Sequence, residues 1–188
     1  YEILIGLVGS EMCIRDSDGT VDLTHYNKFG ANIIASKMAD AIKASGLPIN
    51  KDIISSSVAV SKTDSLKTAN LFVLGSTAAA GTDNSNMAVE SGGFGDYLQK
   101  YLSTKINVKN LAVADATAKS YAYTDEYSTY INELSEGDYV ILNFGENDAD
   151  YIKSADNKYS YPSDNENAKD SFSYYLYNNY IKPAKEKK

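Results

Sequence analysis

A serine that can act as a nucleophile follows a short apolar run in the middle of the chain. Residues 71–74 are apolar, and Gly75, Ser76 and Thr77 come directly after them. A serine in a tight turn at the end of a strand lies at the open edge of a sheet, where its hydroxyl can attack a carbonyl carbon. By itself, such a small-residue sequence more often marks a plain strand-to-helix turn, and it lacks the Lys-Ser/Thr ending of a phosphate-binding loop. Ser76 is therefore a candidate that depends on partners elsewhere.

A candidate general base lies near the start of the chain. The chain contains one histidine, His25, and Asp22 precedes it by three positions. With this spacing on a loop, the carboxylate can hold one imidazole nitrogen while the other nitrogen faces a serine. The same spacing arises by chance in about 10% of chains like this one. The alternative interpretation is a helix-capping aspartate beside a surface histidine.

The elements that must position these residues can be read from hydrophobic periodicity. Three short apolar runs predict buried strands, at residues 71–74, 106–113 and 140–144. Apolar residues at helical spacing predict helices between them, around 94–102 and 127–134. This β-α-β-α-β order predicts a parallel sheet with right-handed crossovers. Ligands of such sheets bind at the carboxyl ends of the strands, which points to the loops at 75–85, 113–122 and 145–150.

Two further helices are expected outside this unit. Residues 27–45 form one amphipathic helix, which Gly46-Leu47-Pro48 ends, and residues 49–69 have the composition of a linker. Apolar residues from Phe172 to Ile181 predict a last helix, which Pro183 and the lysines that follow bring to an end.

Taken in order, the loop sequences resemble a known family. Gly75-Ser76-Thr77 is followed by a glycine-rich segment at 92–95, by Asn-Leu-Ala-Val at 110–113, and by Phe-Gly-Glu-Asn-Asp at 144–148. This series resembles the SGNH, or GDSL, hydrolases, in their rhamnogalacturonan-acetylesterase-like branch. The resemblance implies a three-layer, flavodoxin-like α/β fold, incomplete here, with a parallel sheet and flanking helices.

The resemblance also implies roles for individual residues. Ser76 would be the nucleophile, and the oxyanion hole would consist of the Ser76 N–H, the residue Asp115 and the Asn147 side chain. One such donor contributes about 3 kcal/mol to lowering the barrier. The sequence around Asp22 and His25 resembles the last block of the family, which supplies the base just before the closing helix.

Two positions depart from the family pattern. The aspartate that normally precedes the serine is absent, either deleted or replaced by Gly75, and Asp115 stands where the family has an oxyanion-hole glycine. A carboxylate beside a developing oxyanion opposes it electrostatically, unless the Asp115 side chain turns outward and only its N–H points in.

The last block precedes the first, which predicts a fragment of a tandem protein. Residues 18–48 would carry the C-terminal block and closing helix of one unit, 49–69 the linker, and 71–188 the N-terminal part of a second unit. Residues 1–17 resemble translated sequencing-adapter DNA of a metagenomic fragment and are set aside. The linker is long enough for the helix at 27–45 to return to the second unit. We therefore expect that helix to dock there and to bring His25 to Ser76.

Composition narrows the possible partners and cofactors. A net charge of −7 without a basic cluster argues against nucleic acid, and no apolar stretch reaches the roughly 18 residues of a membrane span. One cysteine and one histidine exclude a thiolate cluster and a multi-histidine metal site, so neither a metal nor another cofactor is expected.

The resemblance implies a serine esterase that deacetylates plant cell-wall carbohydrate through an acyl-enzyme intermediate. Its partner would be an acetylated polysaccharide or oligosaccharide, and its location would be extracellular. The alternative is a catalytically impaired module that keeps the SGNH fold for carbohydrate binding or a structural role.

Overall fold

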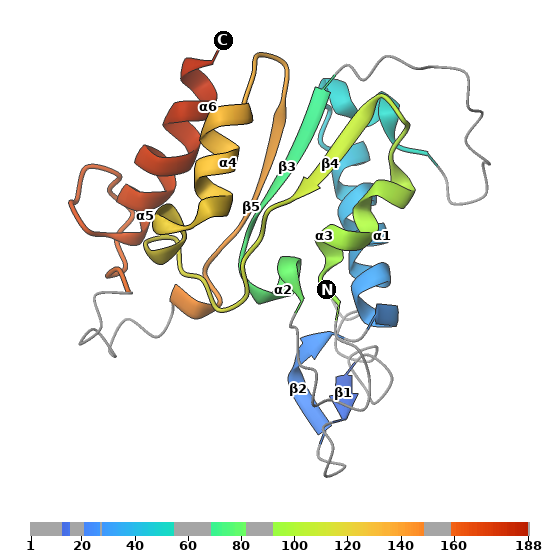
Figure 1. Cartoon of the computed structure of the whole chain (residues 1–188), viewed down its shortest axis with the longest axis horizontal. Helices are drawn as coiled ribbons and strands as arrows, with labels where there is room; N and C mark the ends of the chain where they lie inside the picture. Colours follow the sequence, from blue (N-terminus) through green and yellow to red (C-terminus); the bar gives the residue numbers. More distant parts are fainter. Residues whose placement is uncertain are drawn as a thin grey trace.

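A three-stranded parallel sheet forms the centre of the structure, which is a computed structural model (Figure 1). It describes residues 13–15, 21–26, 28–54, 69–81, 92–148 and 159–187, with the backbone alone for 13–15, 21–26 and Phe29. The strands are β3 (Ala69–Gly75), β4 (Ile106–Asn110) and β5 (Tyr139–Asn143), in the order β4-β3-β5. All three predicted strands are thus confirmed, with β3 in the middle.

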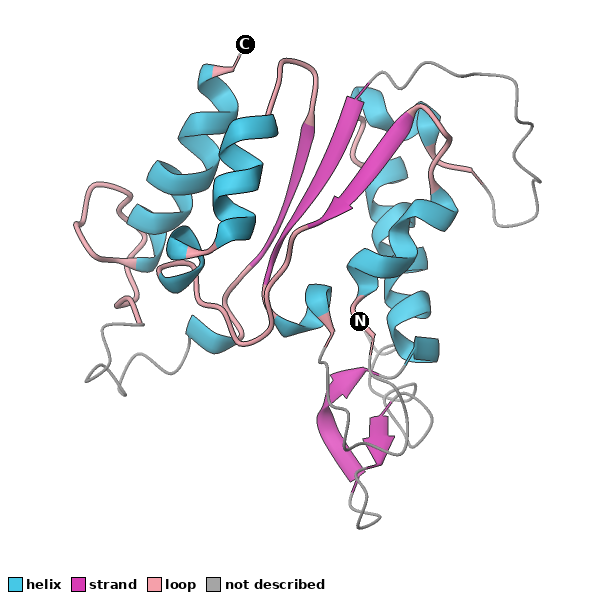
Figure 2. Cartoon of the chain, in the orientation of Figure 1, coloured by secondary structure: helices cyan, strands magenta, loops and turns pink. Residues whose placement is uncertain are grey.

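Helices cover both faces of this sheet and make three layers (Figure 2). Figure 1 shows α1 and α3 on one side of the sheet and α4, α5 and α6 on the other. The helical segments are α1 (Lys28–Ala44), η1 (Pro48–Asp52), α2 (Thr77–Ala80), α3 (Phe94–Tyr97), η2 (Leu98–Tyr101), η3 (Ser120–Tyr123), α4 (Asp125–Glu133), α5 (Phe172–Tyr175), the π-helical η5 (Leu176–Ile181) and α6 (Lys182–Glu186). The predicted three-layer α/β architecture is confirmed.

Strand β3 supplies side chains to two separate cores because neighbouring residues of a strand face opposite sides of the sheet. Leu71 and Val73 lie in the core that α1 and α3 cover, and Phe72 and Leu74 lie in the other. All four are buried. A strand buried on both faces reads as a continuous apolar run, which is why the sequence revealed it.

Helix α1 docks on the first core, as the burial of its apolar stripe requires. Ala35 and Ala39 are buried in the same cluster as Leu71 and Val73. The described start of the expected linker is packed too: Ile49 is buried, and the Ile54 N–H donates to the Tyr101 carbonyl at 2.8 Å. Residues 55–68 of that expected linker lie outside the described part.

The second core is rich in tyrosine, and three of its buried hydroxyls donate to backbone carbonyls. Tyr180 donates to the Ala118 carbonyl at 2.6 Å, and Tyr130 donates to the carbonyl of Tyr180 at 2.9 Å. Tyr121 donates to the Leu111 carbonyl at 2.5 Å. Because each buried hydroxyl has an acceptor, the rings can fill the core without the desolvation cost of an unpaired polar group.

The predicted last helix ends at Glu186, within the lysine-rich segment that was expected to end it together with Pro183, whereas Pro183 itself lies inside the helix. Proline within a helix leaves the carbonyl four residues earlier without its N–H donor. Here that carbonyl belongs to Asn179, and the Tyr127 hydroxyl donates to it at 3.3 Å. The proline also lies in the first turn of α6, after the π-helical segment, where its ring is tolerated.

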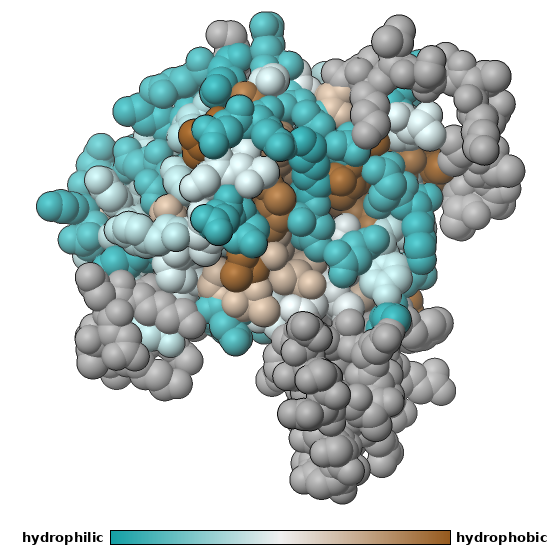
Figure 3. Space-filling model, viewed as in Figure 1, coloured by the Kyte–Doolittle hydropathy of each residue, from teal (hydrophilic) through white to brown (hydrophobic). Residues whose placement is uncertain are grey.

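The surface in Figure 3 is hydrophilic over the helices, with apolar side chains showing along the middle of the molecule. Within the described residues, no helix combines the length and the apolar character needed to cross a membrane.

A small antiparallel sheet lies beside the main one. It pairs β1 (Cys13–Arg15) with β2 (Val21–Tyr26), so part of the segment set aside as adapter-derived takes part in backbone pairing. A two-stranded ribbon is marginal on its own.

We therefore predict that deleting residues 1–17 changes the free energy of unfolding by less than about 1 kcal/mol, measured by urea denaturation. A larger loss would show that the segment belongs to the fold.

The tyrosine core predicts a loss of stability at alkaline pH. Burial raises the pKa of Tyr130 from 10.0 to about 12, with a smaller contribution from Tyr127. Since the unfolded side chain ionises first, its contribution is complete below pH 10 and disappears as the pH rises through about 12. In urea denaturation, Tyr130→Phe should lose about 1 kcal/mol at neutral pH and show a shallower alkaline decline. Tyr123→Phe is the control, because this residue is 82% exposed. It should change neither the stability at neutral pH nor the alkaline decline. An unchanged decline in Tyr130→Phe would contradict this account.

Candidate active site

Ser76 lies at the junction of β3 and α2, at the carboxyl end of the central strand. Its φ and ψ of −109° and −157° are extended, so it is the N-cap of α2, and its carbonyl accepts from the N–H groups of Ala79 and Ala80 at 3.0 Å. Only 1% of the residue is exposed. The nucleophile candidate is therefore where the strand pattern predicted it, but it is covered in this conformation.

Asn147 meets Ser76 from the neighbouring strand's loop. Its Nδ2 donates to the Ser76 Oγ at 2.5 Å, and 71 positions separate the two residues in the chain. The two loops meet because β3 and β5 are adjacent and parallel, so their carboxyl ends share one edge of the sheet. The pairing of the two residues predicted to act on one carbonyl is the central feature of the site.

Asp148 holds the turn that presents Asn147. Its buried carboxylate accepts from the Gly145 N–H at 3.0 Å and from the Ala118 N–H at 2.9 Å. It thereby ties the turn after β5 to the loop after β4. Burial raises the pKa of this carboxyl, and the backbone donors oppose that rise.

Gly75 is fixed by its close approach to β5. A Cβ on Gly75 would lie 2.5 Å from the Asn143 carbonyl oxygen, and its φ is +159°. No larger side chain fits there while β3 and β5 stay paired. A side chain at residue 75 would therefore push β3 and β5 apart at the edge of the sheet where Ser76 lies.

The expected backbone donors of the oxyanion hole are engaged elsewhere in this conformation. The Ser76 N–H donates to the Asn143 carbonyl at 3.0 Å, which extends the β3–β5 ladder by one residue. The expectation that it faces the oxyanion is not met here.

Asp115 has a backbone conformation that glycine adopts readily, in keeping with the glycine that the family resemblance implies at this position. Its φ is +59°, in the left-handed region that side chains other than Gly, Asn and Asp rarely enter. The residue is exposed, so its carboxylate turns outward. Its N–H donates to the Thr77 Oγ1 at 2.9 Å and is thereby also taken. Thr77, a buried residue that sequence reasoning did not single out, thus holds the second expected donor.

Asp22 and His25 lie on strand β2, whereas a loop was expected. In the β1–β2 ribbon, Asp22 is opposite Ile14, and this pairing makes the segment extended. Strand β2 lies against both α1 and α2, the short helix that Ser76 caps. The two side chains fall outside the described part of the chain, so the approach of His25 to Ser76 stays a prediction.

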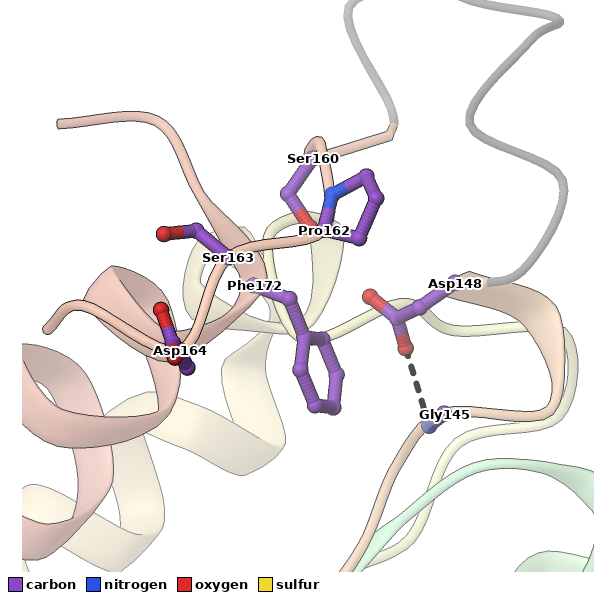
Figure 4. Close-up of a pocket in the computed structure, with 7 residues that line it drawn as sticks. All are labelled: Gly145, Asp148, Ser160, Pro162, Ser163, Asp164 and Phe172. Carbon is purple, nitrogen blue, oxygen red and sulfur yellow. Dashed lines mark hydrogen bonds between the residues drawn. The ribbon is translucent and has the colours of Figure 1, made fainter. Parts of the chain in front are cut away.

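A cavity of about 630 Å³ lies on the other side of the turn after β5. Figure 4 shows its lining, in which Gly145 and Asp148 face residues from the segment 160–172. No pattern in the sequence indicated this cavity, because the polar segment that lines it has no periodicity. Among the described residues, no three His, Cys, Asp or Glu side chains gather as metal ligands would.

Comparisons with known proteins show which family the chain resembles. The family model for GDSL-like Lipase/Acylhydrolase matches residues 64–179, which is more than half of the chain. The chain is 30% identical over 81 residues to a rhamnogalacturonan acetylesterase of Emericella nidulans, and the match covers 43% of this chain and 32% of that protein. The chain thus spans about a third of the length of this curated relative.

The extended ladder predicts how the site can be strengthened. Inserting Asp between Gly75 and Ser76, together with Asp115→Gly, moves the serine one residue, about 3.3 Å, beyond the ladder and restores the glycine. Hydrolysis of an aryl acetate should rise, since one oxyanion donor is worth roughly a hundredfold or more in kcat. The same double change with Ser76→Ala is the control and should show no gain. Equal rates in all of these proteins would contradict an esterase site at Ser76.

Proposed function

This chain belongs to the GDSL-like lipase/acylhydrolase family, and we propose that it is a serine esterase that deacetylates plant cell-wall carbohydrate. The observation that carries this proposal is the hydrogen bond from the Asn147 Nδ2 to the Ser76 Oγ at the carboxyl edge of the sheet. It brings a hydroxyl nucleophile and an amide donor to one point. That is the minimum needed for attack on an ester and for stabilising the resulting oxyanion.

In the proposed reaction, the Ser76 Oγ attacks the acetyl carbonyl carbon as His25 accepts the hydroxyl proton. The carbonyl oxygen becomes an oxyanion, to which Asn147 donates, and Asp22 orients the imidazole. His25 then passes the proton to the sugar oxygen, which leaves as an alcohol while the acetyl group stays on Ser76. Water, deprotonated by His25, releases acetate and restores the serine. The position of β2 against α2 supports these roles for Asp22 and His25.

A second candidate function is a carbohydrate-binding or structural module with an impaired site. It is favoured by the state of the serine, which is covered and whose N–H is held in the β3–β5 ladder. Activity requires that this hydrogen bond, and that of Asp115 to Thr77, give way when the ester binds.

The substrate part of the proposal rests on the similarity to the acetylesterase and on charge. An acetylated polysaccharide or oligosaccharide is uncharged at the ester, and a chain of net charge −7 does not repel it. An extracellular location is proposed for the same reason, because such polymers lie outside the cell.

A fluorophosphonate probe tests the proposed nucleophile. Mass spectrometry should find the probe on Ser76, and Ser76→Ala should abolish labelling. Ser128→Ala, at an exposed serine of α4, should label as the unchanged protein does. Asn147→Ala should lower aryl acetate hydrolysis by roughly a hundredfold or more, whereas Asn167→Ala, at an exposed site, should not. Absence of labelling together with retained binding of a cell-wall oligosaccharide would favour the module instead.

A further inference from the structure

We propose that the cavity beside the β5 turn is a subsite for one neutral sugar ring of the substrate, and that it disfavours uronic acid units. This inference rests on the proposed function, because it assigns the cavity to the glycosyl unit next to the acetylated one. At about 630 Å³, the cavity lies within the range of small-molecule sites in proteins.

The turn after β5 contacts the nucleophile with one residue and the cavity with two others. Asn147 contacts Ser76, whereas Gly145 and Asp148, its neighbours in the same turn, line the cavity. The same turn therefore contacts both the nucleophile and the cavity. A sugar polymer that crosses the turn can present an acetyl group to Ser76 while the next ring is held.

The lining combines an unsatisfied hydroxyl with apolar surface. Ser160 is 5% exposed, and its Oγ has no hydrogen-bond partner. A buried hydroxyl without a partner costs about 1–3 kcal/mol, and a ligand hydroxyl reached by rotation about χ1 would remove that cost. Figure 4 shows Phe172 and Pro162 beside it, with the Asp148 carboxylate extending from the opposite wall.

Aromatic and apolar surface at the cavity suits the CH-rich face of a sugar. The Phe172 ring approaches Gly145, where an added Cβ would lie 4.0 Å from its Cζ. Tyr161, between two lining residues, is 45% exposed although it is a large aromatic side chain. Its backbone is held by the Phe172 N–H, which donates to the Tyr161 carbonyl at 2.9 Å. Hydroxyl and ring together are typical of sites for polar molecules with one apolar face.

Charge sets the preference for a neutral ring. Asp148 and Asp164 line the cavity, and its described lining contains no Lys, Arg or His. The Asp148 carboxylate is buried, where the screening of a second negative charge is weak. Among these described residues, a uronate carboxylate would meet like charge and no cationic side chain, whereas the hydroxyls of a neutral ring carry no charge to be repelled.

The test measures binding without turnover, by titration calorimetry of the unchanged chain with xylotriose, a neutral trimer, and with trigalacturonate. Xylotriose should bind more tightly by about threefold or more. Ser160→Ala should weaken xylotriose binding about threefold to tenfold, while the free energy of unfolding stays unchanged or rises, because the hydroxyl has no partner to lose. Ser128→Ala on α4 is the matched control, and it should alter neither xylotriose binding nor the free energy of unfolding.

Three results would overturn the subsite: equal or tighter binding of trigalacturonate, binding of neither trimer, or unchanged affinity in Ser160→Ala. These results are distinct from failure of the proposed function, since binding of a non-acetylated trimer does not use Ser76. If the chain prefers the neutral trimer but the fluorophosphonate probe does not label Ser76, the subsite is supported and the esterase proposal is rejected. If Ser76 is labelled but the neutral trimer is not preferred, only the subsite proposal is rejected.

Discussion

The parallel pairing of β3 with β5 determines everything else at the candidate site. Because the two strands are in register to Gly75 and Asn143, their loops leave the sheet at the same edge. Ser76 and Asn147 then meet across 71 positions of sequence. The same pairing also places the Ser76 N–H on the Asn143 carbonyl, so one interaction both assembles the site and keeps one of its expected donors occupied.

The turn after β5 is stable because a buried carboxylate satisfies its backbone. Asp148 accepts from both Gly145 and Ala118 and so joins two loops that the strands alone bring only near each other. Its neighbours in the second core act in a similar way, since the Tyr180 hydroxyl donates to the Ala118 carbonyl. The loops of the site therefore rest on the tyrosine-rich core, which explains why so many tyrosines lie inside the protein.

The strands and helices could be predicted from the sequence more fully than the hydrogen bonds and the cavity between them. The strands could be found because burial on both faces makes them continuous apolar runs. Strand order placed the loops of Ser76 and Asn147 at one edge of the sheet, and the family resemblance implied that these two residues act together. Hydrogen-bond partners are not encoded in such patterns. The Asp115 N–H donates to Thr77 from a left-handed backbone, and the Tyr127 hydroxyl donates to the Asn179 carbonyl, four residues before Pro183. The cavity was missed because the segment around Ser160 has neither periodicity nor a motif.

The close approach at Gly75 also has a consequence for how residue 75 can vary. With a Cβ there 2.5 Å from the Asn143 oxygen, any side chain at this position meets the backbone of β5. A substitution therefore acts on the β3–β5 pairing, which is the same interaction that brings Ser76 to Asn147. At the last residue of β3, the fold and the candidate site cannot change independently of each other.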